Sequence, residues 1–403
     1  MKERRAYIIK TSRRIPPFGD DVGDVLINQK PLRDRQQEAL SEAGFTTRYI
    51  DQEDEIAAED YPCVLFTDDL YFNGHAFREF VRHSETGPDS TQCVIPKGPA
   101  SPFLQICAPF QDGEAEDRIR HSLYYLKNPG TDGCQEIPLD IGEHKIPVNI
   151  PAHMREGAEI ALPLCLRPLI QIKHPLHILW ASIACLNTRF RELRDSRVRQ
   201  FLLLLRARSL KPARLLAHMN KIGRGCEIHP TAYLEGAEIG NHVRIGANAV
   251  IRMSNIGDGC DIGDGTVVKH SVVGEGSVIF DDLTLGFAVC YPETFLIHGP
   301  YHLSVFGRSS AMFATILGDF RVDGGPIRLE VDGELVPYPF IFIGSFIGHR
   351  TRVAGGCIIP PGRMIPNDLF IFPPAGSMLT KIDDDLPQGA PLSIEEGGLQ
   401  QMS

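Results

Sequence analysis

The chain has 403 residues, which is long enough for two ordinary domains that each bury a core. Its composition, 43% hydrophobic and 23% charged, is that of a soluble globular protein, and no apolar run approaches the length of a membrane span. The net charge of −10 argues against nucleic acid or an anionic membrane as the main partner.

The first residues are charged and lead directly into an apolar run at residues 6–10, so we expect no secretory signal and a cytoplasmic protein. The ten cysteines include no Cys-x-x-Cys pair, which favours a reducing compartment over a disulfide framework or a zinc site. No set of histidines recurs at a fixed spacing, and the sequence therefore predicts no metal centre.

Residues 1–165 alternate between strand and helix patterns, which predicts an α/β domain. Apolar runs at residues 6–10 and 62–67 indicate strands, and residues 32–43 indicate a helix. Asp68 and Asp69 end the second strand, where ligand-binding groups of parallel sheets usually gather. The two carboxylates would also suit a plain structural role as caps of the segment that follows.

The run LINQKPL at residues 26–32, closing at Gly44, resembles a stretch of the sugar nucleotidyltransferases. This resemblance implies a nucleotide-binding domain in which Asp68 or Asp69 holds Mg²⁺. It does not extend to the Pro-Lys pair that precedes this stretch in those enzymes, because that pair is absent here.

The segment that should hold phosphate also departs from that family. Those enzymes open with a Gly-rich loop whose amides cradle phosphate, whereas this chain has TSRRIPP at residues 11–17. Arg13 and Arg14 would still meet phosphate, but without small residues the backbone cannot approach it closely. We therefore favour a degenerate nucleotidyltransferase-like domain, with a divergent active domain as the alternative.

Residues 166–220 connect the two halves and indicate a helical segment. The segment carries four consecutive leucines at residues 202–205 and an arginine-rich stretch with Arg189, Arg191, Arg194, Arg197 and Arg199. We expect the leucines to pack inward and the arginines to face water, with binding of an anion or acidic partner as the alternative.

The strongest signal is an internal period of six that begins at about Lys221. Aliphatic residues recur six apart, with three five-residue steps, at Ile222, Ile228, Leu234, Ile239, Ile245, Ile251, Ile256, Ile262, Val268, Val273, Ile279 and Leu285. The series returns at Ile341, Ile347, Val353, Ile359, Ile365 and Ile371. A triangular coil explains the period, because each side points one aliphatic residue inward and then turns a tight corner. Small residues fill a slot near each corner, which gives Cys226, Cys260 and Cys357 a structural role.

With this period, the sequence resembles the hexapeptide-repeat acyltransferase superfamily, whose coils form a left-handed parallel β-helix. The nearest likeness is to bifunctional sugar-1-phosphate nucleotidylyltransferase/acetyltransferases, at VVKHSVV (residues 267–273), TILGDFRVDG (315–324), IPPGR (359–363) and the connector stretch HPLHIL (174–179). The resemblance implies an all-β domain over residues 221–379, acetyl-CoA or another acyl-CoA as donor, a small-molecule acceptor and a homotrimer. Residues 380–403 are expected to form a flexible tail.

In those bifunctional enzymes a histidine just after the first of these stretches acts as the base, and Asp281 takes its place here. Residues 287–313 follow, which we interpret as an insertion that interrupts the coil. The interpreted insertion carries several polar groups, namely His298, Tyr301, His302 and Arg308.

Acyl transfer needs a base for the acceptor proton, and a histidine suits this task because its pKa lies near neutrality. We predict His302 or His298 as this base, with Asp281 as a weaker candidate because an ordinary carboxylate is too weakly basic. Tyr301 and Arg308 would contact the acceptor. The alternative is that all these side chains only order a long loop.

Further contacts are implied by the matched stretches. Lys269 and Arg321 would touch the acceptor. The acyl-CoA would lie along the late coils, at Gly355, Gly356, Arg350 and Arg363. Arginines on a coil are more often merely solvated, and this alternative stays open.

Three functions are compatible with the sequence. The first is a CoA-dependent acyltransferase that acts on an amino sugar, a sugar phosphate or a nucleotide sugar. The second is an enzyme that still makes a nucleotide sugar at Asp68 and Asp69 with Mg²⁺. The third is a non-catalytic protein that binds a nucleotide sugar or serves as a scaffold.

Overall fold

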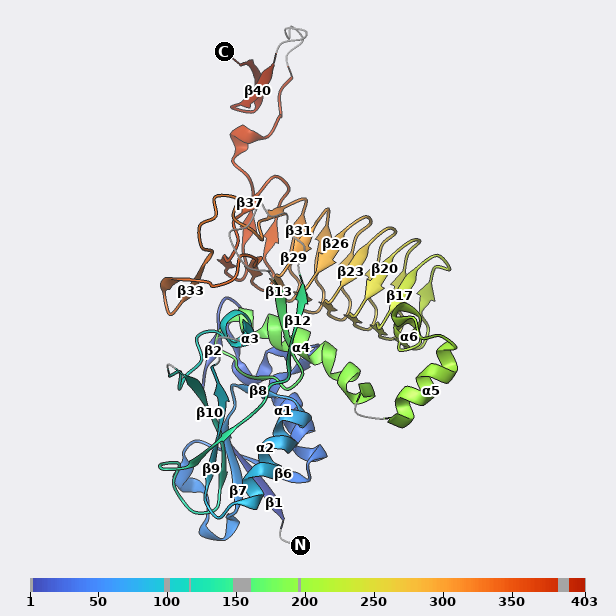
Figure 1. Cartoon of the computed structure of the whole chain (residues 1–403). Helices are drawn as coiled ribbons and strands as arrows, with labels where there is room; N and C mark the ends of the chain where they lie inside the picture. Colours follow the sequence, from blue (N-terminus) through green and yellow to red (C-terminus); the bar gives the residue numbers. More distant parts are fainter. Residues whose placement is uncertain are drawn as a thin grey trace.

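The computed structural model describes residues 3–97, 102–115, 117–147, 161–194, 197–382 and 391–402. An α/β domain lies at one end, a parallel β-helix lies above it, and helices connect the two (Figure 1).

A six-stranded mixed sheet forms the N-terminal domain, in the order β11-β9-β10-β7-β1-β6. Its strands are β1 (Arg4–Ile9), β6 (Phe45–Ile50), β7 (Cys63–Thr67), β9 (Thr91–Pro96), β10 (Arg118–Leu126) and β11 (Gln135–Pro138). Strand β10 runs antiparallel to β7 and β9, and the other neighbouring pairs are parallel. The helices are α1 (Leu32–Glu42), α2 (Gly74–Thr86) and α3 (Pro102–Ile106). The strands expected at residues 6–10 and 62–67 and the helix expected at 32–43 are thus confirmed as β1, β7 and α1.

Four short antiparallel pairs complete this part of the chain. They are β2 (Arg14–Ile15) with β3 (Asp20–Asp21), β4 (Leu26–Ile27) with β5 (Lys30–Pro31), β8 (Leu70–Phe72) with β14 (Leu169–Gln171), and β12 (Glu143–Pro147) with β13 (Ala161–Cys165).

Three helices rather than one lead to the β-helix: α4 (Pro175–Arg194), α5 (Arg197–Ala207) and α6 (Pro212–Ala217). Residues 175–187 of α4 are mostly buried, with Trp180 1% exposed. On α5, Leu202 and Leu205 are 53% and 56% exposed, so the prediction that the leucines pack inward is wrong within this chain. The side chains of Arg189, Arg191, Arg194 and Arg199 lie outside the described part. Among the described helices, none is long and apolar enough to span a bilayer.

The C-terminal half coils into three parallel sheets, one on each side of a triangle. The first sheet contains β15 (Lys221–Ile222), β18 (Glu238–Ile239), β21 (Asn255–Ile256), β24 (Val272–Val273), β27 (Val289–Cys290), β30 (Val305–Phe306), β35 (Phe346–Ile347) and β38 (Met364–Ile365). The second contains β16 (Glu227–Ile228), β19 (Arg244–Ile245), β22 (Asp261–Ile262), β25 (Val278–Ile279), β28 (Phe295–Ile297), β31 (Ala311–Phe313), β36 (Arg352–Val353) and β39 (Phe370–Ile371). The third contains β17 (Tyr233–Glu235), β20 (Val250–Arg252), β23 (Val267–Lys269), β26 (Thr284–Gly286) and β29 (Tyr301–His302), and β32 (Ile316–Leu317) and β37 (Ile358–Ile359) continue this side.

We call the turn from the first sheet to the second the first corner, the turn from the second to the third the second corner, and the turn from the third back to the first the third corner. In the early coils, residues 17 apart are stacked, as Ile239 is on Ile256. Ile256 and Val273 are fully buried, which confirms the predicted aliphatic interior of these coils. Cys260 is buried beside the same interior, and burial raises the pKa of its thiol to about 11, in keeping with a structural role.

Residues 287–313 are not an insertion, and this prediction was wrong. They form strands β27 to β31, which pair in parallel with the coils on both sides. The inward positions hold Tyr301, Phe306 and Met312, each 0% exposed, in place of Ile, Leu or Val. The aliphatic period is lost here although the coil itself continues.

The actual excursion lies later, at residues 318–344, and contains the antiparallel hairpin β33 (Arg328–Val331) and β34 (Glu334–Pro337). The coil resumes afterwards, because Leu317 of β32 pairs with Ile359 of β37. The excursion reaches the N-terminal domain, where the Tyr338 hydroxyl donates to the carbonyl oxygen of Ile106 over 2.8 Å.

The last residues are more ordered than predicted. Strands β40 (Leu392–Glu395) and β41 (Gly398–Gln401) form an antiparallel hairpin, which corrects the expectation of a flexible tail for this segment. Residues 383–390, which fall in the same predicted tail, lie outside the described residues.

The two domains share one hydrophobic core. The ring of Phe18 lies 5.3 Å from that of Tyr291 and 5.1 Å from that of His349. Nδ1 of His349 accepts from the backbone amide of Arg308, so Nε2 carries the proton that it donates to Asp20, 3.1 Å away. Residues 11–21 therefore pack against the β-helix. From the sequence, this segment was considered as a loop that binds nucleotide phosphates.

Three histidines are buried in the N-terminal domain and at the start of α4. Burial lowers the pKa of His121 and His174 to about 3 and that of His177 to about 4, from an ordinary value of 6.5. Such a group stabilises the fold fully above its unfolded pKa, and this stabilisation is lost as the pH falls toward its folded pKa. We expect the free energy of unfolding to drop by up to about 2 kcal/mol per histidine between pH 6.5 and pH 5.

Urea unfolding at pH 8, 6.5 and 5 measures this dependence. The variant His121→Leu removes one of the three groups and should lose less stability over the same pH interval. An equal loss in both proteins would contradict the assignment.

Candidate functional site

His302 lies at the end of β29, at the third corner. Its Nδ1 is 3.1 Å from Oδ2 of Asp319, and the two side chains are 39% and 35% exposed. A neutral imidazole that donates from Nδ1 to a carboxylate keeps the lone pair of Nε2 available. The pair therefore holds an accessible imidazole in the tautomer that a general base requires.

Glycine makes room for this imidazole. A Cβ on Gly286, which lies one coil earlier in the same column, would stand only 2.8 Å from Cδ2 of His302. Lys269 precedes Gly286 in that column, two coils from His302 or about 10 Å along the axis. Of the predicted acceptor contacts, Lys269 is thus on the same corner as His302.

Three arginines surround a groove of about 360 Å³ that begins near the start of the excursion. The groove is lined by Arg321, Val322, Asp323, Ile327, Arg328, Pro360, Pro361 and Arg363. Arg321 pairs with Asp323, whereas no carboxylate among the described residues forms an ion pair with Arg328 or Arg363. The groove is therefore suited to an anionic group, and it unites Arg321 and Arg363, which the sequence assigned to two different ligands.

The His302–Asp319 pair and the arginine groove lie on the same corner. A ladder of backbone hydrogen bonds along this corner runs from Gly286 through Leu303 and Gly344 to Gly362. His302 is adjacent to Leu303, and Arg363 is adjacent to Gly362, two coils further on. Asp319 and Arg321 are separated by a single residue, so the His302–Asp319 pair lies next to the arginine groove.

Other predicted residues lie elsewhere on the coil. His298 lies at the second corner, beside β28, and Arg308 lies at the first corner, between β30 and β31. Asp281 is also at the second corner, where its Oδ1 accepts from the amide of Asp264 over 2.8 Å. Within one chain these residues do not converge with His302.

Tyr301 cannot line an open acceptor pocket in this structure. Its side chain is 0% exposed inside the coil, and its hydroxyl donates to the carbonyl oxygen of Ile297 over 3.0 Å. Neighbouring residues of a strand face opposite sides, so an inward Tyr301 places His302 outward.

The residues predicted for acyl-CoA divide between two regions. Arg363 lines the arginine groove, as described above. Arg350 instead lies at the first corner and donates to both carboxylate oxygens of Asp368, at 2.5 and 2.7 Å. Gly355 and Gly356 follow β36 at the second corner, away from the His302–Asp319 pair.

Asp68 and Asp69, the two carboxylates considered for Mg²⁺, form their bonds with other protein groups. Asp69 is 0% exposed and bonds Arg13 (2.9 Å), Thr67 (2.6 Å) and Gln171 (3.0 Å). Asp68 accepts from the amide and the hydroxyl of Thr11, at 3.0 and 2.6 Å.

Arg14 points to the surface, where Nε lies 3.3 Å from Oδ1 of Asp21. No group of three metal-ligating side chains occurs in the part of the chain that the structure describes. Among the described residues, Asp69 is thus enclosed by protein groups, and Arg14 forms a surface pair with Asp21.

Comparison with known proteins gives matches to the coil region. Residues 221–252 match the family model described as bacterial transferase hexapeptide (six repeats). Among solved structures, a variant of perosamine N-acetyltransferase from Caulobacter crescentus in complex with CoA and GDP-perosamine is 19% identical over 44% of this chain and 61% of that chain, with a TM-score of 0.19. The acetyltransferase domain of PglB from Neisseria gonorrhoeae in complex with acetyl coenzyme A is 19% identical over 41% of this chain and 60% of that chain, with a TM-score of 0.15.

This chain thus spans about three fifths of each of these two structures. At TM-scores this low the two likenesses carry no argument about activity. No curated protein sequence matches the chain.

Sequence reasoning missed Asp319 and Arg328. Asp319 follows His302 by 17 residues, which is the length of one early coil, and this spacing was a usable signal. Arg328 reaches the groove only because the excursion folds back as a hairpin, and no local pattern indicates that.

The adjacent residues Arg13 and Arg14 provide a matched pair of variants. Arg13→Ala leaves the buried charge of Asp69 without its cation and should lower the free energy of unfolding at pH 8 by about 3–5 kcal/mol. Arg14→Ala removes a surface pair and should cost less than about 1 kcal/mol.

Burial already raises the pKa of Asp69, and loss of Arg13 raises this pKa further. The Arg13→Ala defect should therefore be smaller at pH 5, where the carboxyl is more readily protonated, than at pH 8. Denaturant unfolding at both pH values measures this, and similar effects of the two alanine variants would refute the proposed role of Arg13.

Proposed function

We propose that this protein is a CoA-dependent acyltransferase, most simply an acetyltransferase, whose catalytic domain is a left-handed β-helix of the hexapeptide type. The acceptor is an amino sugar, a sugar phosphate or a nucleotide sugar. The observation that carries the proposal is the His302–Asp319 pair on the same corner as the arginine groove. The hexapeptide match at residues 221–252 supports it.

In this proposal Nε2 of His302 removes the proton of the acceptor amine or hydroxyl as that atom attacks the thioester carbonyl. The bond between the carbonyl carbon and sulfur then breaks, and CoA leaves as a thiolate that takes up the proton held on Nε2 of His302. Asp319 stabilises the imidazolium that forms in between, because its carboxylate holds Nδ1. No residue of the chain becomes covalently modified.

The arginine groove would bind the phosphates of the acyl donor or of the acceptor. Guanidinium groups suit phosphate because they donate two parallel hydrogen bonds. Arg328 and Arg363 are the groups to consider first, since Arg321 is already paired with Asp323. Lys269, on the opposite side of His302 along the corner, would meet the remaining part of the acceptor.

For the N-terminal domain we propose a role without nucleotidyl transfer. The enclosure of Asp69 by Arg13, Thr67 and Gln171 supports this role. The alternative of a divergent active domain needs a rearrangement that frees this carboxylate. A purely non-catalytic protein is disfavoured by the accessible imidazole and its carboxylate partner.

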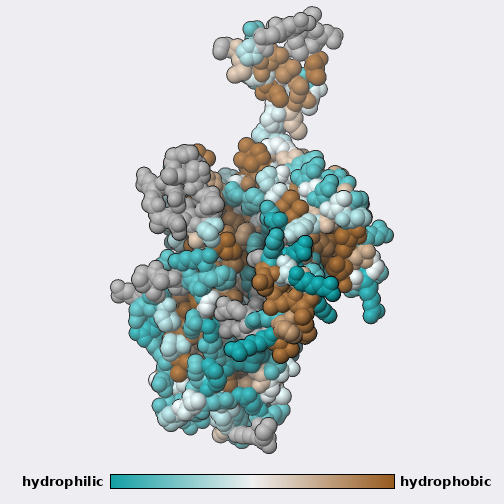
Figure 2. Space-filling view, turned by 45° about the vertical axis from the view of Figure 1, so that its right-hand side comes forward, coloured by the Kyte–Doolittle hydropathy of each residue, from teal (hydrophilic) through white to brown (hydrophobic). Residues whose placement is uncertain are grey.

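We also propose that the chain forms a homotrimer. The N-terminal domain covers the first sheet along β24, β27 and β30, so self-association would use other surfaces. Helix α5 exposes a row of apolar side chains, namely Val198, Phe201, Leu202, Leu204 and Leu205. The space-filling view shows apolar surface in this region, bordered by hydrophilic groups (Figure 2). A second copy of the chain is the occupant that would bury this row.

The catalytic proposal predicts a clear difference between two histidines. His302→Ala should lower kcat with acetyl-CoA by about 10²–10⁴-fold, because the acceptor proton loses its base. Asp319→Asn should lower kcat by a smaller factor, and His298→Ala should change it little. A panel of amino sugars and their nucleotide derivatives, with release of free thiol as the readout, measures these rates.

Calorimetry with acetyl-CoA gives the control for folding and binding. His302→Ala should keep the affinity for acetyl-CoA. Full turnover in His302→Ala, or the absence of acetyl-CoA binding to the unmodified protein, would refute the proposal.

The proposed trimer is tested on α5. The double variant Phe201→Glu, Leu205→Glu places two charges in the exposed row and should lower the mass in solution from three chains toward one, as measured by light scattering. Leu335→Glu is the matched control, because Leu335 is 49% exposed on the hairpin of the excursion. An unmodified protein of one chain would contradict the trimer.

A further inference from the structure

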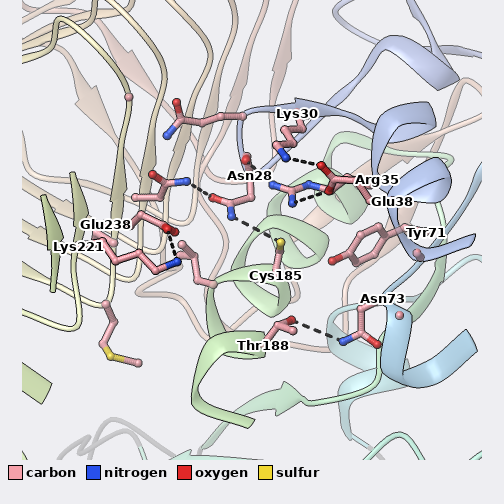
Figure 3. A pocket seen from close by; sticks show the side chains of 18 of the residues that line it. Asn28, Lys30, Arg35, Glu38, Tyr71, Asn73, Cys185, Thr188, Lys221 and Glu238 are labelled. Carbon is pink, nitrogen blue, oxygen red and sulfur yellow. Dashed lines mark hydrogen bonds and ion pairs between the residues drawn. The ribbon is translucent and has the colours of Figure 1, made fainter. Parts of the chain in front are cut away.

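A second cavity lies between the two domains, away from the corner described above. It has a volume of about 690 Å³. On one side it is lined by the turn between β4 and β5, by α1, by the start of α2 and by α4, and on the other side by the first coils of the β-helix (Figure 3). We call it the interdomain cleft. Asn255 in this cleft lies three coils before the coil of His302, about 14 Å along the axis.

The wall of the interdomain cleft is held by hydrogen bonds around Asn28, one of which joins the β-helix to the N-terminal domain. The amide nitrogen of Asn255 on β21 donates to Oδ1 of Asn28 over 2.8 Å. The backbone amide of Asn28 donates to the hydroxyl of Ser182 on α4 over 3.0 Å. Arg35 donates to the carbonyl oxygens of Ile27 and Asn28, at 3.1 and 2.8 Å. The cleft is therefore preformed, which reduces the entropy lost on binding.

One buried polar group in the cleft has no strong partner. Tyr71 is 1% exposed, and its hydroxyl forms no hydrogen bond of normal geometry with any described residue; its polar neighbour is the Cys185 thiol, a weak partner. Figure 3 shows the Tyr71 ring with its hydroxyl directed into the cleft, between Arg35 and Cys185. An unsatisfied buried hydroxyl costs about 1–3 kcal/mol, so a ligand that offers it a hydrogen bond gains affinity at this position. Burial raises the pKa of Tyr71, which keeps the hydroxyl as a donor.

The charges of the cleft balance one another. Lys30 pairs with Glu38, and Lys221 pairs with Glu238 over 3.0 Å (Figure 3). Arg78 pairs with Glu42 over 3.1 Å. No cation is left in excess, in contrast to the arginine groove, where two guanidinium groups form no ion pair with a described carboxylate. Phosphate is therefore a poor match for the cleft.

The remaining lining offers amides, carboxylate oxygens and apolar carbon together. Gln29 and Asn73 supply amides, while Ile239, Met253 and Leu186 supply apolar surface. Carboxylates already paired with one cation still have lone pairs for hydroxyl donors. A sugar ring combines hydroxyl groups at its edge with an apolar face, and it matches this lining.

We propose that the interdomain cleft binds a neutral saccharide unit, with the Tyr71 hydroxyl as one of its hydrogen-bond donors. This site is separate from the acyl-transfer site and does not depend on the activity proposed there. Because both domains contribute to the cleft, a bound saccharide also joins them and should raise the melting temperature of the whole chain.

The test uses the full chain and four probes: methyl N-acetylglucosaminide, methyl glucoside, maltotriose and inorganic phosphate. Saturation-transfer NMR and calorimetry measure binding. At least one saccharide should bind, and phosphate at the same concentration should not compete with it. In Tyr71→Phe the affinity for that saccharide should fall about five- to thirtyfold, because one hydrogen bond is lost.

The same variant separates binding from folding. Tyr71→Phe removes an unsatisfied hydroxyl and keeps the ring, so the melting temperature without ligand should stay the same or rise. Tyr49→Phe, on the exposed strand β6, is the control and should leave the affinity unchanged.

Three results would overturn the proposal. They are the absence of binding by all three saccharides, displacement of the bound saccharide by phosphate, and equal affinity in the unmodified protein and Tyr71→Phe. A saccharide whose binding is lost in His302→Ala, Arg363→Ala but kept in Tyr71→Phe would be bound at the third corner, which also refutes the cleft.

Discussion

The rest of this structure depends on one constraint, the parallel register between successive coils. In the early coils each position meets its equivalent 17 residues later, as Ile239, Ile256 and Val273 do. Interior side chains therefore form columns, and every interior residue contacts the coils on both sides. The backbone bonds are satisfied by the stacking itself, so the coil tolerates a change of side chain better than a change of register. Tyr301 and Phe306 fill the column where aliphatic residues end, and the coil continues without a break.

The same register gives the third corner its chemistry. Coils are about 4.8 Å apart, so a large outward side chain leaves little space for the equivalent residues before and after it. Gly286 lies before His302, and a Cβ on Gly344, which follows in the corner ladder, would stand 2.0 Å from the Ser304 hydroxyl. The absence of a side chain at Gly286 thus allows the imidazole to lie against the coil and reach Asp319, while Gly344 allows the end of the excursion to pass close to Ser304. The excursion begins at this point and brings the arginines to the same corner.

The sequence predicted the structure where the local backbone geometry determines the type of residue at each position. Isoleucines such as Ile245 and Ile262 at regular spacing predicted the coils, and the apolar runs at residues 6–10 and 62–67 predicted β1 and β7. Prediction failed at residues 287–313, because an aromatic residue such as Tyr301 does not continue the aliphatic pattern. Only the shape of the coil interior identifies its position as buried. His302 was proposed from the sequence for its chemistry, whereas its neighbour Asp319 could be named only from the length of the coil. The interdomain cleft was out of reach, since its two walls are far apart in the chain and meet only through domain docking.

The outward residues of the first sheet show how the N-terminal domain is held against the β-helix. Along β24, β27 and β30 these residues are Val272, Val289 and Val305, each at most 2% exposed because the N-terminal domain covers them. On the earlier strands β15, β18 and β21 the same column holds Lys221, Glu238 and Asn255, which line the cleft. One face is thus apolar where it docks and polar where it does not. A β-helix without its partner domain would expose the valine column to water. Packing of this column therefore holds the N-terminal domain in place, and the polar end of the same face lines the cleft.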